Sequence, residues 1–182
     1  KNIFDKNSKV KNVLKENNIS EANLKKHINH PESISIIQEF KPDLLVSVLG
    51  NEIFKKPIIN LAKKGCINLH TALLPKYRGL MPSFWVLKNN EEFTGVSVFF
   101  VDEGIDSGPI IVQKKVKIND LTQQQLIKIT KKIGMDAIAE AIDLIENDNI
   151  DLIENDDSEK TYYSFPKRSD VKDFYNKGKR FF

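Results

Sequence analysis

Three polar side chains, found in two short stretches of the sequence, have the types and spacing that acyl-transfer chemistry needs. Asn68 and His70 stand two residues apart in INLHTALLPKYRG, where an apolar run ends. Side chains two apart on a strand point to the same face, so both are expected to enter one cleft. Asp106 lies between Gly104 and Gly108 in VDEGIDSGPI, and glycines allow a tight turn toward the same strand ends. An amide, an imidazole and a carboxylate are therefore expected to converge.

Such a set can transfer an acyl group from a donor with a reactive carbonyl to an incoming amine. The amide NH2 of Asn68 and a protonated His70 can donate hydrogen bonds to the oxyanion of the tetrahedral intermediate. Asp106 can orient the imidazole and help move a proton off the amine through water. The reaction then requires no nucleophile from the protein.

Each of these residues also has a structural explanation that the sequence leaves open. His70 could be a structural histidine, and Asn68 could close a loop through hydrogen bonds of its side chain to the backbone. Asp106 could be an ordinary turn residue. Cys66 is expected to be a small buried apolar residue. Three histidines and one cysteine without metal-ligand spacing indicate no metal site. The sequence contains no G-x-S-x-G, no P-loop and no G-x-G-x-x-G, which disfavours hydrolase-triad, triphosphatase and dinucleotide-binding functions.

Composition indicates one soluble globular domain. The 182 residues are 40% hydrophobic, which is enough to bury a sizeable core. The net charge of +3 is the balance of 28 basic and 25 acidic residues spread along the chain, so a nucleic-acid partner is not expected. No apolar run reaches the roughly 18 residues of a membrane span, and no signal peptide opens the sequence. We expect a cytoplasmic protein without a membrane partner.

Strands that alternate with helices predict an α/β fold with a Rossmann-like, mostly parallel sheet flanked by helices. The expected strands are residues 43–49, 66–70, 94–101 and 110–118. The expected helices are residues 9–16, 32–40, 57–65 and 82–90, a long amphipathic helix that follows a capping box of Thr122 and Gln125, and a last short helix that Ser169 caps and that ends near Gly178. The acidic segment that repeats the tetrad IEND is interpreted as a surface hairpin or linker.

The two stretches, in this order and at this spacing, closely resemble the signature of the formyltransferases that use N10-formyltetrahydrofolate. The resemblance is strong over residues 41–118. It implies the formyltransferase fold, a catalytic set of Asn68, His70 and Asp106, and no metal. It also implies that two loops wrap the pterin of the co-substrate, largely through backbone groups. The residues assigned to the co-substrate are Leu49, Gly50, Asn51, Ile53, Val101, Asp102, Glu103, Gly104 and Ile105.

The loop LLPKYRG resembles that of the methionyl-tRNA and sugar-amine formyltransferases and is implied to bind the amine acceptor. The acceptor-binding residues are Pro75, Tyr77, Arg78 and Gly79. Arg78 is expected to hold an anionic group of the acceptor or of folate, and pairing with a nearby carboxylate is the alternative. We expect a small amine, such as a nucleotide-linked amino sugar. A methionyl-tRNA formyltransferase-like enzyme and a non-catalytic folate or nucleotide-sugar binding module remain open, as does a homodimer.

The resemblance also predicts how the chain is divided. Residues 1–160 are expected to form the formyltransferase catalytic domain, and residues 161–182 a C-terminal extension with a short helix. Family members usually begin with a strand, a helix and a second strand before the region where this sequence starts. The catalytic domain is therefore expected to lack these first N-terminal elements.

Overall fold

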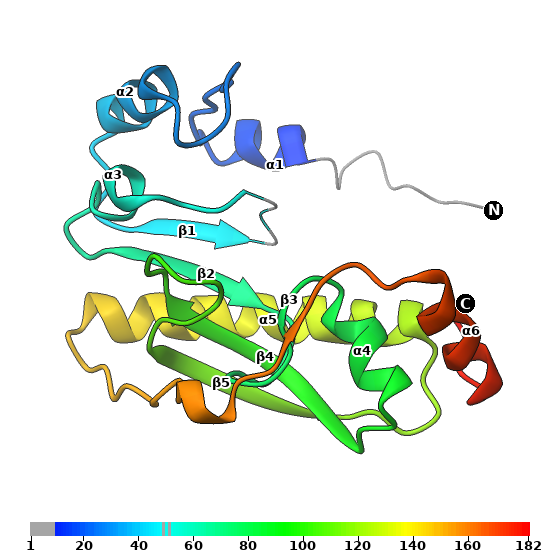
Figure 1. The fold of residues 1–182 in the computed structure, drawn as a ribbon. Helices are drawn as coiled ribbons and strands as arrows, with labels where there is room; N and C mark the ends of the chain where they lie inside the picture. Colours follow the sequence, from blue (N-terminus) through cyan, green and yellow to red (C-terminus); the bar gives the residue numbers. More distant parts are fainter. Residues whose placement is uncertain (1–9, 49, 51) are drawn as a thin grey trace.

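A four-stranded mixed sheet forms the centre of the molecule (Figure 1). The structure is a computed structural model and describes residues 10–48, 50 and 52–182. The strands of this sheet lie in the order β1 (Leu45–Val48), β2 (Cys66–His70), β4 (Phe93–Phe100) and β5 (Ile110–Lys117). A second sheet pairs β3 (Arg78–Gly79) with β6 (Tyr162–Tyr163). The expected α/β class with a Rossmann-like sheet is confirmed.

The expectation that the sheet is mostly parallel is wrong for the strands that the structure describes. β1 and β2 are parallel, whereas β2 pairs with β4, and β4 with β5, in antiparallel register. Residues 101–109 join β4 to β5 directly, and so short a connection allows a hairpin but not a crossover. Because six consecutive residues of β4 are buried, its continuous apolar pattern resembles that of a parallel strand.

Helices surround this sheet. They are α1 (Val10–Glu16), α2 (Pro31–Glu39), α3 (Lys56–Ile59), α4 (Pro82–Lys88), α5 (Gln123–Glu146) and α6 (Arg168–Asn176), with a short 3-10 helix at Asp157–Glu159. Figure 1 shows α1 to α3 beside β1 and α5 along one face of the sheet. Thr122 and Gln125 form the predicted capping box at the start of α5. None of the helices in the described part of the chain is long and apolar enough to cross a membrane.

The main core lies between α5 and the sheet. Its buried residues are Ile67 and Leu69 of β2, Val96 and Val98 of β4, Ile111 and Val112 of β5, and Ala137, Ile138, Ala141 and Ile145 of α5. Cys66, next to Ile67, is 1% exposed, and burial raises the pKa of its thiol to about 11. The thiol therefore stays protonated at neutral pH, in keeping with its interpretation as a small buried apolar residue.

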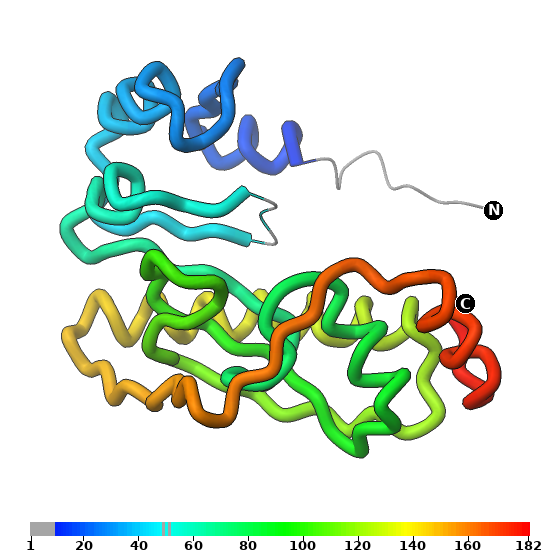
Figure 2. Tube along the Cα trace, viewed as in Figure 1, coloured from blue at the N-terminus to red at the C-terminus, as the bar shows by residue number. Residues whose placement is uncertain are grey.

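The segment after α5 packs against the rest of the chain (Figure 2). It runs back across the molecule, pairs through β6 with β3, and ends in α6 beside α4. Phe174 of α6 is 0% exposed and stacks on Phe84 of α4, with ring centroids 4.8 Å apart. The domain boundary at residue 160 stays a prediction, and side chains from both sides of it share this core. The prediction that Ser169 caps this helix is wrong, because α6 begins at Arg168 and its N-terminal cap is Lys167, whose backbone N–H donates to Asp170.

The two copies of the IEND tetrad have different environments. Asn147 of the first copy is the exposed C-terminal cap of α5. In the second copy, Ile153 forms a β-bridge with Ile110, and Asn155 is 9% exposed. The second copy also lies at the surface, as interpreted for the whole segment, except that the side chain of Asn155 is buried.

If α6 belongs to the cooperative core, then Phe174→Ala will lower the free energy of unfolding by about 3–5 kcal/mol, because it leaves a cavity between stacked rings. Denaturant unfolding measures the change. Lys172→Ala, at an exposed position of the same helix, is the matched control and should change stability by no more than about 0.5 kcal/mol. Equal stability of the two variants would show that α6 is not part of this core.

Candidate active site

A cleft of about 310 Å³ lies at the carboxyl ends of β1 and β2, beside the loop of residues 101–109. Its walls are Ser47, Gly50, Glu52, Ile53, Phe54, Asn68, Gly79, Leu80, Phe99, Val101, Asp102, Gly104, Ile105, Asp106 and Tyr162. Polar groups from β2 and the loop thus face apolar side chains from the segment after β1. A small planar molecule could bind between such walls through a few directed hydrogen bonds.

The structure brings His70 and Asp106 together. His70 ends β2, is 7% exposed, and has its Nδ1 3.5 Å from Oδ2 of Asp106. Its Nε2 lies 2.7 Å from the carbonyl oxygen of Tyr77. A carbonyl only accepts hydrogen bonds, so Nε2 carries a hydrogen and donates it. Both ring nitrogens face protein groups, and the expected bond from His70 to an oxyanion would have to replace one of these contacts.

Asp106 presents its carboxylate to the cleft from a left-handed backbone conformation. Its φ of +49° is uncommon outside glycine, although Asp tolerates it better than most residues. The backbone N–H of Gly79 donates to Oδ2 of Asp106 at 2.8 Å. The oxygen that faces His70 is therefore also held by the backbone of β3.

Asn68 reaches the cleft from the middle of β2. Its Oδ1 is buried and has no hydrogen-bond partner among the residues that the structure describes. Leaving a buried acceptor unsatisfied costs about 1–3 kcal/mol. This oxygen only accepts hydrogen bonds, so only a group that donates one could satisfy it.

Of the predicted acceptor-binding residues, Gly79 lines the cleft, whereas Pro75, Tyr77 and Arg78 are not among its walls. The Tyr77 hydroxyl donates to Glu91 at 2.5 Å. Burial and then this hydrogen bond raise the pKa of the Tyr77 phenol above its ordinary value, so the phenol stays neutral. Gly79 has φ +94°, and a Cβ there would collide with the carbonyl oxygen of Tyr163.

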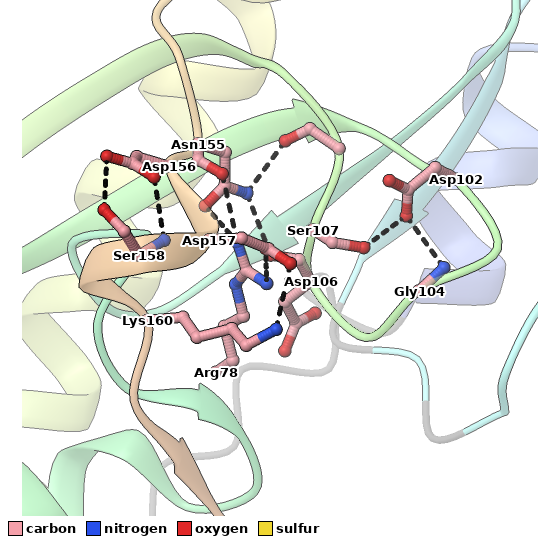
Figure 3. A network of polar contacts seen from close by, with 11 residues as sticks. Arg78, Asp102, Gly104, Asp106, Ser107, Asn155, Asp156, Asp157, Ser158 and Lys160 are labelled. Carbon is pink, nitrogen blue, oxygen red and sulfur yellow. Dashed lines mark hydrogen bonds and ion pairs between the residues drawn. The ribbon is translucent and has the colours of Figure 1, made fainter.

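Arg78 pairs with a carboxylate, which is the alternative that the sequence left open. The residue is 4% exposed, and its Nη1 donates to Oδ1 of Asp157 at 2.7 Å. Its Nη2 donates to the side-chain oxygen of Asn155 at 2.8 Å and to the carbonyl of Asn155 at 3.2 Å (Figure 3). Hydrogen bonds from Lys160 and from Arg78 hold the pKa of Asp157 below its usual range.

Most of the residues predicted to bind the co-substrate surround the cleft. Gly50, Ile53, Val101, Asp102, Gly104 and Ile105 line it, whereas Leu49 and Asn51 lie outside the described residues. Glu103 is not among the walls, and its carboxylate pairs with Lys56 at 2.9 Å. Asp102 accepts hydrogen bonds from the N–H of Gly104 and the hydroxyl of Ser107, so its side chain shapes the loop.

Several residues of the site were missed in the sequence, among them Asn155 and Tyr162. Asn155 was hidden in the repeated tetrad, because an identical asparagine in the first copy is an exposed helix cap. Tyr162 of β6 lines the cleft beside Gly79 and follows a polar segment without a recognisable pattern. No group of three or more His, Cys, Asp or Glu residues is placed to hold a metal ion within residues 10–48, 50 and 52–182.

The sequence has close relatives among curated proteins. It matches a family model described as formyl transferase over residues 3–142. The methionyl-tRNA formyltransferase of Thermodesulfovibrio yellowstonii is 37% identical over 148 residues, which is 81% of this chain and 48% of that protein. The chain thus spans about half the length of the curated relatives it matches.

Solved structures with the same fold include two N-formyltransferases. A sugar 3-N-formyltransferase, crystallised in the presence of dTDP and 5-N-formyl-THF, is 26% identical with a TM-score of 0.66, over 88% of this chain and 54% of that one. The N-formyltransferase from Helicobacter canadensis, in complex with folinic acid and dTDP-3-aminofucose, is 26% identical with a TM-score of 0.65. That alignment covers 86% of this chain and 53% of the other.

Close packing of Gly79 under β6 predicts a large effect of adding one methyl group. Gly79→Ala should lower the free energy of unfolding by about 1–3 kcal/mol more than Gly178→Ala, because it adds a collision with Tyr163. Gly178 has φ +72° and open space around it, so its variant carries only the cost of the left-handed conformation, about 1–2 kcal/mol. Denaturant unfolding of both variants provides the comparison, and equal losses would contradict the observed contact between β3 and β6.

Proposed function

Because the chain belongs to the formyl transferase family, we propose that it transfers a formyl group from N10-formyltetrahydrofolate to the primary amine of a small molecule. The observation that carries this proposal is the contact of His70 with Asp106 beside a cleft that Asn68 and Asp106 both line. Since the chain spans about half the length of its curated relatives, the activity is inferred from the site and the family together.

The cleft fits the ring system of the co-substrate. Its volume of about 310 Å³ is at the lower end of small-molecule pockets, which run from about 300 to 1,000 Å³, so it suits the pterin rather than the whole molecule. Ile53, Phe54 and Ile105 supply apolar surface, and the backbone of the 101–106 loop can supply hydrogen bonds. Asn68 lies in the same wall, where its NH2 group can donate a hydrogen bond to the oxygen of a formyl group attached to the bound ring system.

The residues have complementary parts in the reaction. The amine nitrogen attacks the formyl carbon, the bond from that carbon to N10 breaks, and the proton lost by the amine ends on N10. Asn68 donates to the oxyanion of the tetrahedral intermediate through its NH2 group. Asp106 receives the amine proton and passes it on, directly or through water. His70 orients the carboxylate of Asp106 through Nδ1. The carbonyl of Tyr77 fixes the imidazole ring by accepting a hydrogen bond from Nε2.

A small amine is supported as acceptor by the two sugar N-formyltransferases described above, each aligned over more than four fifths of this chain. The charge balance supports it too. Binding of tRNA usually neutralises several phosphates with a basic surface, and 28 basic against 25 acidic residues offer little excess. An amino sugar on a nucleotide is the proposed class of substrate, and the cytoplasm is the proposed location.

A second candidate acceptor is the methionyl group on initiator tRNA. The specific observation in its favour is the 37% identity to a methionyl-tRNA formyltransferase, which exceeds the 26% identity to the sugar enzymes. That alignment covers 48% of the relative, so it compares one part of the enzyme and leaves acceptor binding by the remainder outside the comparison. The chemistry at Asn68, His70 and Asp106 is the same for both acceptors.

The role of Asn68 as an oxyanion donor predicts that Asn68→Ala lowers kcat for formyl transfer by about 10²–10³-fold, which is the usual cost of one lost donor. The affinity for a tetrahydrofolate analogue, measured by calorimetry, should change less than about threefold, because the loops provide most contacts to the ring system. Lys63→Ala, at an exposed position outside the cleft, is the control and should match the wild type in both assays. Full activity of Asn68→Ala would contradict the assigned role.

The acceptor proposal is tested by offering the formyl donor with a panel of nucleotide-linked amino sugars, and separately with charged initiator tRNA, while following tetrahydrofolate release. We expect turnover with an amino sugar and weak, strongly salt-dependent binding of tRNA in a gel shift. Rapid transfer to the methionine of the charged tRNA would replace the small-amine acceptor with the second candidate. A lack of turnover with every amine would favour a non-catalytic binding module.

A further inference from the structure

The backbone of Asp106 needs support from outside its own loop. A non-glycine residue in the left-handed region stores about 1–3 kcal/mol, and such strain persists only where the surroundings hold it. The side chain of Asp106 is held by Gly79 and faces His70, as described above. Its carbonyl is held by a different part of the chain, the segment between α5 and β6.

Asn155 supplies that support with both hydrogens of its amide. Its Nδ2 donates to the carbonyl of Asp106 at 2.9 Å and to the carbonyl of Gly108 at 2.8 Å. Its Oδ1 accepts from Nη2 of Arg78 at 2.8 Å. This orientation of the amide is the one the contacts permit, because a flipped group would place its oxygen against two carbonyls and its NH2 against a guanidinium.

Arg78 connects the same asparagine to the backbone that contacts the catalytic pair. Tyr77, just before it, accepts the hydrogen bond of His70, and Gly79, just after it, donates to Asp106. The guanidinium bonds Asn155 on one side and Asp157 on the other. Figure 3 shows Arg78, Asn155 and Asp106 as parts of one network. The contacts therefore form a closed ring that runs through both catalytic side chains.

We propose that Asn155 and Arg78 are positioning residues, which fix the carboxylate of Asp106 against His70 for the proposed formyl transfer. Neither residue lines the cleft, so neither is placed to touch substrate. Their effect is on geometry, since a displacement of about 1 Å at reacting groups can cost about 10²-fold in rate. The expected loss of rate rests on the proposed function. The expected change in the environment of His70 rests on the structure alone.

Asn155→Asp is the informative variant because it has nearly the same shape. It keeps an acceptor for Arg78, while its second oxygen replaces the NH2 group that faces the carbonyls of Asp106 and Gly108. We expect kcat to fall by about 10–100-fold while KM for the acceptor stays within about threefold, the pattern of a lost transition-state interaction.

A second readout reports the position of the carboxylate without any turnover. The chain has three histidines, so the ¹⁵N resonances of their rings can be assigned with a His70→Gln variant. In Asn155→Asp, the Nδ1 resonance of His70 should move most of the way toward its position in Asp106→Asn. This measurement separates the two proposals, because it stays informative if the wild type transfers no formyl group to any amine.

Two further variants complete the test. Glu154→Ala, at the exposed neighbouring position, should leave both kcat and the Nδ1 resonance unchanged. Arg78→Lys keeps the charge but cannot bond Asn155 and Asp157 together from two nitrogens, so it should move the resonance in the same direction. A wild-type Nδ1 resonance in folded Asn155→Asp or folded Arg78→Lys would overturn the proposal. Failure of both variants to fold would overturn it as well, by assigning the two residues to overall stability.

Discussion

The site depends on the backbone of three consecutive residues, 77–79, which contacts both His70 and Asp106, the proposed catalytic pair. Tyr77 offers a carbonyl to Nε2 of His70, and Gly79 offers an N–H to the carboxylate of Asp106. A carbonyl can only accept and an N–H can only donate, so the two contacts fix which atoms of the pair face each other. His70 ends β2, whereas Asp106 lies in the loop between β4 and β5, and this short segment contacts both.

The same segment explains why residues far along the chain belong to the site. As β3, it pairs with β6, and Gly79 packs so closely under Tyr163 that no side chain fits there. Tyr162 reaches the cleft from the same pairing. Phe174 then anchors α6 against α4 in the core shared with Tyr77. The cleft is thus built by the loops after β1 and β4 together with the C-terminal segment, so residues 161–182 contribute to the site as well as to the core.

The sequence was sufficient for what is local and insufficient for what depends on long-range contacts. Strand β2 and the glycine-bracketed loop located His70 and Asp106, and the capping box located the start of α5. Strand direction was misjudged, because burial on both faces hides the difference between a parallel strand and a hairpin strand. The environment of Asn155 could not be read from a tetrad whose other copy caps a helix. From the sequence, Arg78 could bind either an anionic group of a ligand or a carboxylate of the chain, and its hydrogen bond to Asp157 in the structure shows the second.

The burial of Arg78 limits which residues around the cleft can be substituted. A guanidinium that is 4% exposed and bonded on two sides cannot be replaced by another residue without loss of its bonds to Asn155 and Asp157. Those bonds lie outside the cleft, so the walls that meet an acceptor can change while the ring of contacts around His70 and Asp106 stays the same. Under the proposed function, the choice of acceptor and the geometry of His70 and Asp106 are then separate properties of the chain. This separation is compatible with the occurrence of both tRNA and sugar enzymes among its relatives.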